Sequence, residues 1–143
     1  MSTLDTDAWV ARWRTPEHAY LGVRAERIEG GATAFSVELR YDDERADDPL
    51  FASAAVTHAV DIAVLGVVTG HIDHRQQQAS GTASLHVNYL RPLAGLLIVE
   101  ARLASWDDYA AVVAVDARNE VGELILTGLS TYALRPMEPR GGA

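Results

Sequence analysis

The spacing of apolar and polar residues divides the chain into short strands and two helices. Residues 6–14 carry apolar side chains at helical spacing, which predicts a short amphipathic helix that Pro16 stops. Tyr20, Leu21 and Val23 are the core candidates of the strand that follows. Runs rich in β-branched and apolar residues predict strands at 18–28, 32–40, 81–91, 96–105, 109–118 and 124–134.

Turn-forming and acidic residues separate these strands. Residues 32–40 alternate Phe35, Val37 and Leu39 with smaller or polar side chains, a pattern typical of a half-buried strand. The acidic segment 42–49 is expected to be a solvated loop. The last third of the chain then holds four strands, or three and a break, and their close spacing indicates antiparallel hairpins.

The longest apolar run predicts a central helix over residues 51–69, which Gly70 ends and which Asp47 or Asp48 caps at its start. Its length approaches that of a membrane span. However, the run is mostly alanine and valine and carries Asp61, whose charge is costly in lipid. We therefore expect a buried helix in a soluble protein.

A helix that is apolar on all sides must be enclosed by other elements. A single antiparallel sheet curled around the central helix does this, which predicts an α+β fold. We expect one domain over residues 1–143, with its core at about 18–135 and a flexible tail at 136–143.

Composition excludes several classes of protein. The net charge is −8, and the 12 basic residues are all arginine and are scattered, whereas a nucleic-acid binder needs a basic stripe. There is no cysteine, which excludes disulfides and thiolate zinc sites. The first residues lack the basic and apolar regions of a signal peptide, so we expect a cytoplasmic protein without a membrane partner.

Three segments carry a resemblance to a known family. Residues 81–92 (GTASLHVNYLRP) are similar to the strand of hotdog-fold acyl-CoA thioesterases that ends in an aromatic-Leu-Arg-Pro signature. Residues 58–61 (HAVD) resemble the helix stretch in which an aspartate follows an apolar pair, and 126–132 (LTGLSTY) resemble the closing strand. The separation of Asp61 from Pro92 suits the phenylacetate-degradation branch of that family.

The resemblance implies a hotdog fold, an antiparallel sheet wrapped around a long central helix. It also implies a thioester substrate such as an acyl-CoA, no cofactor, and a homodimer or dimer of dimers with the site between subunits. One motif departs from the branch: residues 52–54 (ASA) stand where it has His-Gly-Gly. Ser53 takes the place of the glycine whose N–H polarises the thioester oxygen. The resemblance therefore implies that the Ser53 N–H is this donor, although its side chain crowds the approach. The branch's asparagine upstream of the helix has no match.

Asp61 is the strongest chemical candidate because it is the only carboxylate in the apolar helix. The resemblance implies that it acts as general base on water or as nucleophile on the thioester carbonyl. The alternative is a structural acid that bonds to a partner subunit or to His58 one turn away. Thr82 aligns with a family hydroxyl that holds water or steadies the carboxylate, although a β-branched residue also simply suits a strand.

His58 can tune Asp61, supply a missing donor to the substrate, or be a core residue. Arg91 can bind a coenzyme A phosphate or form a salt bridge with one of the 20 acids. Trp106 is expected to pack on the sheet edge rather than stack on adenine. The sequence 71–74 (HIDH) is only weakly suggestive of a metal site, and we expect no metal. Two rivals to an enzyme stay open, a hotdog protein that binds an acyl or aromatic ligand without hydrolysing it and a purely structural dimer.

Overall fold

The computed structural model describes residues 6–138 of the chain. Its elements, in chain order, are α1 (Thr6–Arg12), α2 (Pro16–Leu21), β1 (Val23–Glu29), β2 (Ala32–Glu38), the 3₁₀ helix η1 (Glu44–Asp47), α3 (Pro49–His71), β3 (Gln77–Tyr89), β4 (Leu96–Trp106), β5 (Ala110–Asn119) and β6 (Leu124–Pro136).

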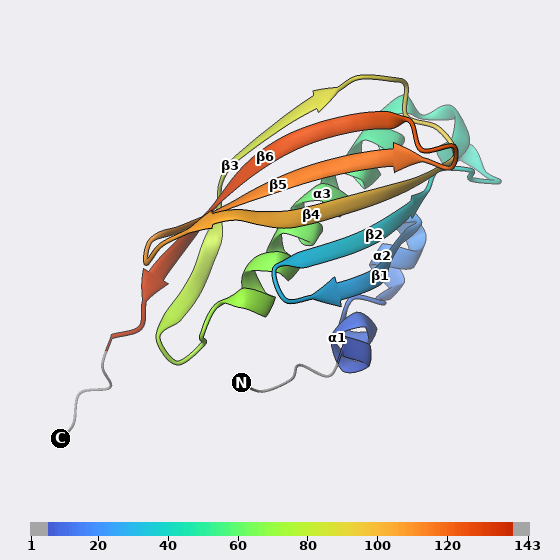
Figure 1. Ribbon diagram of the computed structural model, residues 1–143. Helices are drawn as coiled ribbons and strands as arrows, with labels where there is room; N and C mark the ends of the chain where they lie inside the picture. The colour runs from blue at the N-terminus through green and yellow to red at the C-terminus, as the bar shows by residue number, and fades with distance from the viewer. Residues whose placement is uncertain (1–5, 139–143) are drawn as a thin grey trace.

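The six strands form one antiparallel sheet in the order β1-β2-β4-β5-β6-β3. The sheet curls around α3, which crosses its concave face (Figure 1). Alternate residues of the strands and most of α3 meet in a core that includes Phe35, Leu97 and Leu126, all fully buried. The predicted α+β fold, a sheet wrapped around a long helix, is confirmed.

α3 is defined at its start by local capping. The Asp48 carboxylate accepts from the Leu50 N–H at 2.9 Å, and Pro49 occupies the first helical position, where its missing N–H costs nothing. The helix runs through Gly70 to His71, so the expected stop at Gly70 is wrong, because Gly70 does not adopt the left-handed conformation of a capping glycine. By length and composition α3 could cross a membrane, but its enclosure by the sheet makes it a core helix.

β2 approaches α3 closely at one point. A Cβ on Gly66 would meet the Thr33 methyl at 3.0 Å, and the Thr33 hydroxyl donates to the Ala63 carbonyl at 2.7 Å. This contact fixes the height of the helix above the sheet. The outward-facing Ala34 and Ser36 are also buried, so β2 is covered on both faces and the half-buried expectation is wrong there, since small side chains between neighbouring strands are shielded.

The segment before β1 differs from the sequence expectation. Residues 16–21 form a helix instead of the first half of a strand, because Thr15 caps it, Pro16 begins it and Gly22 ends it in the left-handed region (φ 77°). Pro16 therefore starts a helix and does not merely stop α1. Tyr20, expected in the core, is 56 % exposed.

β3 begins four residues earlier than expected and pairs with β6 instead of forming a hairpin with β4. The reason is topological: α3 crosses the whole sheet and delivers β3 to the edge farthest from β1. Residues 139–143 of the expected flexible tail lie outside the described residues. In the described part of the expected tail, Pro136 ends β6 and the Met137 N–H donates to the Gln76 carbonyl at 2.7 Å.

The chain reversal at Gly22 offers a test of the fold. Gly22→Ala places a Cβ against the Glu38 carbonyl and should lower the free energy of unfolding by about 3 kcal/mol or more. Gly122→Ala is the matched control, since its φ of 83° is similar but its Cβ meets nothing within 4 Å, and it should cost only about 1 kcal/mol. Urea denaturation measures both, and equal losses would contradict the described contact.

Candidate active site

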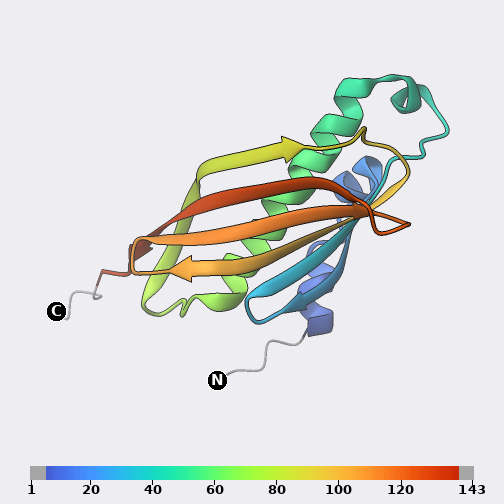
Figure 2. The same cartoon turned by 45° about the horizontal axis from the view of Figure 1, so that its top comes forward.

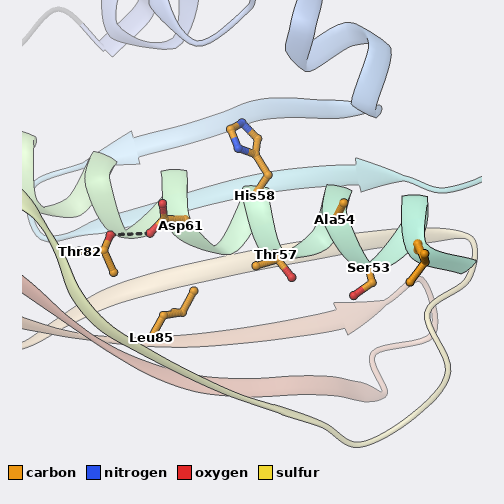
Figure 3. A pocket seen from close by; sticks show the side chains of 8 residues that line it. Ser53, Ala54, Thr57, His58, Asp61, Thr82 and Leu85 are labelled. Carbon is orange, nitrogen blue, oxygen red and sulfur yellow. Dashed lines mark hydrogen bonds between the residues drawn. The ribbon is translucent and has the colours of Figure 1, made fainter.

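A pocket of about 600 Å³ lies between α3 and the edge strand β3, and we call it the α3–β3 pocket. Its helix residues recur every three or four positions and so share one side of α3, while two residues come from β3 (Figure 3). The lining consists of Leu50, Ser53, Ala54, Thr57, His58, Asp61, Thr82 and Leu85. Most of the exposed surface of the pocket is apolar, although five of the eight side chains carry a polar group, and the Asp61 carboxylate lies at one end.

Asp61 and Thr82, two of the expected site residues, are in direct contact. The Thr82 hydroxyl donates to Asp61 Oδ1 at 2.7 Å, and Figure 3 shows this bond across the gap between helix and strand. Asp61 is half-buried rather than fully buried, because its side chain opens into the pocket. Thr82 therefore orients one oxygen of the carboxylate at a site that is partly shielded from solvent.

β-bulges in β3 make this contact possible. Thr82 and Leu85 are three residues apart, so in a regular strand their side chains would point to opposite faces. The register between β3 and β6 shifts between Thr82 and Ser84, and again between Ala79 and Gly81, and the extra residues turn Thr82 toward α3. The strand bends at this part of its length (Figure 2).

His58 also lines the pocket, but its hydrogen bond leads away from Asp61. Its Nε2 lies 2.9 Å from Nε2 of His18, and Nδ1 of His18 donates to the Trp13 carbonyl at 2.6 Å. Burial lowers the pKa of His58, the neighbouring His18 lowers it further, and Asp61 opposes both. These effects together favour the neutral form of His58. Burial also raises the pKa of Tyr132, with a smaller contribution from the Asp61 charge.

Ser53 lies on the same side of α3 as Asp61 but not beside it. The two residues are eight positions apart, which corresponds to about 12 Å along a helix axis. In a helix that begins at Pro49, the Ser53 N–H points at the Pro49 carbonyl and is not among the free donors of the first turn. The Ser53 hydroxyl, by contrast, faces the pocket.

Arg91 lies outside the pocket lining. Its guanidinium forms an ion pair with Glu123 at 3.3 Å, and its side chain is 56 % exposed. Of the two sequence interpretations, the salt bridge is the one the structure contains, and an exposed ion pair of this kind contributes little stability.

The residues after α3 make separate contacts. The ring of His71, at the end of α3, meets the ring of Trp106 edge-on at 4.1 Å between centroids. Trp106 ends the inner strand β4, so it packs against the helix and not, as expected, on the sheet edge. His74 Nε2 donates to the Thr69 carbonyl at 2.9 Å. Within residues 6–138, no three His, Asp or Glu side chains gather as metal ligands.

Sequence reasoning missed several pocket residues. Leu50 and Thr57 precede Asp61 at helical spacing, so counting back from the acid in steps of three and four would have found them. Tyr89, whose hydroxyl lies 3.0 Å from that of Thr57, forms a second bridge between β3 and α3. His18 carried no such signal, because its partner is 40 residues away and its segment was expected to be a strand.

No protein-family model and no curated protein matches the chain. Solved structures do match it. A mutant thioesterase from Pseudomonas aeruginosa superposes with a TM-score of 0.77 at 19 % identity, over 94 % of this chain and 96 % of that one. A thioesterase from Staphylococcus aureus gives 0.71 at 15 % identity, over 85 % and 100 %. One from Haemophilus influenzae gives 0.70 at 14 % identity, over 98 % and 96 %.

These likenesses establish the fold of the chain, which is the hotdog fold expected from residues 81–92 and the central helix. At such low identity they do not assign an activity to the chain.

The electrostatic contact between Asp61 and His58 is open to test. Asp61→Asn should lower the pKa of His58 further below its ordinary value, because the negative charge that favours the imidazolium form is gone. A ¹H–¹⁵N NMR titration of the histidine rings measures this. Thr82→Val, which keeps the carboxylate, is the control and should leave the midpoint of His58 nearly unchanged. The same midpoint in Asp61→Asn and wild type would show that the two groups do not interact.

Proposed function

We propose that this protein hydrolyses an acyl thioester, with an acyl-CoA as substrate, and that Asp61 is its general base or nucleophile. The observation that carries the proposal is the Asp61 carboxylate, half-buried at the end of an apolar pocket and bonded to Thr82 at 2.7 Å. The match of the fold to proteins described as thioesterases supports it. The separation of Asp61 from Pro92 favours the phenylacetate-degradation branch. We propose that the protein acts in the cytoplasm.

The pocket suits the two halves of such a reaction. Leu50, Ala54 and Leu85 offer an apolar surface to the acyl group, while Asp61 faces the carbonyl. In the general-base route Asp61 takes a proton from water as the oxygen attacks the carbonyl carbon, the C–S bond breaks, and the thiolate takes the proton back. In the nucleophilic route an Asp61 oxygen attacks the carbonyl carbon, and the C–S bond breaks to give a mixed anhydride and a thiolate. Water then hydrolyses the anhydride, which frees the Asp61 carboxylate, and the thiolate takes the proton that the water loses. Thr82 orients the carboxylate in both.

Stabilising the carbonyl oxygen requires a donor near Asp61, and Ser53 of the same chain is about 12 Å away along the helix. We propose that a second copy of the chain supplies its Ser53, so that the site lies between subunits of a homodimer or dimer of dimers. β3 supports this arrangement because it is an edge strand of 13 residues beside the pocket, and long edge strands in native proteins are usually covered. Since the Ser53 N–H is directed at its own helix, its hydroxyl is the proposed donor.

Arg91 completes the proposed substrate contacts. It lies two residues after the end of β3, and its exposed ion pair with Glu123 can exchange for a phosphate of coenzyme A at small cost.

The second candidate is a hotdog protein that binds an acyl or aromatic ligand without turning it over. Residues 52–54 favour it, because they lack the two glycines of the family motif and the N–H of Ser53 is directed at Pro49. The open carboxylate in the pocket favours hydrolysis, since a pure binding pocket gains nothing from an acid that must be kept partly dehydrated.

Asp61→Asn should lower kcat for hydrolysis of an acyl-CoA panel by about 100-fold or more, because the amide neither takes a proton nor attacks the carbonyl. Thr82→Val should lower kcat by about 10-fold, whereas Thr82→Ser, which keeps the hydroxyl, should stay close to wild type. Thiol release monitored by absorbance measures all three. Binding of a panel member by calorimetry without turnover in wild type would instead support the ligand-binding candidate.

The intersubunit arrangement predicts complementation between two inactive variants. In a mixed dimer of Ser53→Ala and Asp61→Asn chains, one of the two sites combines an intact Ser53 with an intact Asp61. Co-refolding equal amounts should therefore restore about a quarter of the wild-type sites. An inactive mixture would place both residues of a site on one chain, and full activity of Ser53→Ala alone would remove the hydroxyl from the mechanism.

A further inference from the structure

A buried histidine behind the pocket has no role in the proposed hydrolysis. His18, from α2, is only 9 % exposed, and it connects the pocket residue His58 to the carbonyl of Trp13. The Trp13 ring packs against Phe35 edge-on at 6.1 Å, so this chain of contacts ends in the core. Figure 3 shows the ring of His58 directed away from Leu85, on the flank of α3 opposite β3.

The two hydrogen bonds limit the protons that the pair can hold. The Trp13 carbonyl only accepts, so His18 Nδ1 carries a hydrogen. The two Nε2 atoms lie 2.9 Å apart and share one hydrogen between them. In the neutral pair that hydrogen belongs to His58, which leaves His58 Nδ1 as an acceptor. One extra proton can be accommodated by the pair, but a second would set two N–H groups against each other.

We propose that His18 is a positioning residue of the α3–β3 pocket. His18 holds His58 against α2 as the neutral Nε2–H tautomer, and it releases His58 when the pair takes up a second extra proton. The tautomer and the link do not depend on the proposed function. The effect of His58 release on catalysis does rest on the proposed function.

Release of His58 would act on the pocket through Asp61. His58 lies three residues before Asp61, and side chains at that spacing meet on a helix surface. A free imidazolium there would pair with the carboxylate, and a paired carboxylate is a weaker base. Among the described residues, Glu17 from α2 interacts with His18, and Asp61 from α3 interacts with His58. Both favour proton uptake, while burial of His58 opposes it.

Two substitutions at position 18 separate the contacts. His18→Asn keeps an amide N–H for the Trp13 carbonyl but loses the link to His58. His18→Gln keeps a carbonyl oxygen to accept from His58 Nε2 but does not titrate. Both keep a polar group in the site, and thermal unfolding monitored by circular dichroism checks that each variant is folded.

Long-range ¹H–¹⁵N NMR spectra of the free protein report the tautomer and titration of each ring. In wild type and His18→Gln, His58 should show a protonated Nε2 and a bare Nδ1 above neutral pH. In both variants the titration of His58 should move to higher pH, because neither side chain at position 18 can carry the positive charge that opposes protonation of His58. An Nδ1–H tautomer of His58 in wild type, or the same titration in His18→Asn and wild type, would overturn the proposal.

The pH profile of kcat/KM tests the effect of His18 on catalysis. His18→Asn should move the acidic limb of the profile to higher pH in parallel with the His58 titration. In His18→Gln the limb should not follow the His58 titration, because the Gln carbonyl still holds His58 away from Asp61. A change in KM at all pH values with an unmoved acidic limb would indicate a merely structural role and overturn the catalytic part. Absence of hydrolysis in wild type would contradict the proposed function alone, since the NMR result stands apart from it.

Discussion

The structure depends on the enclosure of one helix that is apolar on nearly every side. α3 cannot be left in water, and a single curled sheet covers it from β1 at one edge to β3 at the other. The close approach at Gly66, where the Thr33 hydroxyl bonds to the helix backbone, brings sheet and helix into van der Waals contact. Enclosure is least complete beside β3, and there the pocket lies.

The polar groups of α3 are concentrated where enclosure ends. Asp61 marks the border: the residues after it on the helix are largely buried, while those before it alternate between the core and the pocket. A carboxylate at such a border keeps some water and gains a fixed donor from Thr82, so it stays available without the full cost of burial. The bulges of β3 connect this chemistry to the sheet, since a regular strand would have turned Thr82 away.

Much of the fold could be predicted from periodicity, because α3, β2 and β4–β6 carry strong patterns that tertiary packing reinforces. α2 was missed because its signals are single residues, the Thr15 cap and Gly22, inside a segment that also suits a strand. For the site, Asp61 followed from its isolation in an apolar run, whereas its bond to Thr82 came only through a family resemblance. The His18–His58 contact joins residues 40 positions apart and had no local signal at all.

The central claim is that Asp61 meets a thioester carbonyl in the α3–β3 pocket. A crystal structure with a non-hydrolysable acyl-CoA analogue, in which a methylene ketone replaces the thioester, tests it most directly. The account predicts the ketone carbon about 3–3.5 Å from a carboxylate oxygen of Asp61, with the acyl group against Leu85. An analogue bound elsewhere, or bound in the pocket with its carbonyl turned away from Asp61, would contradict it.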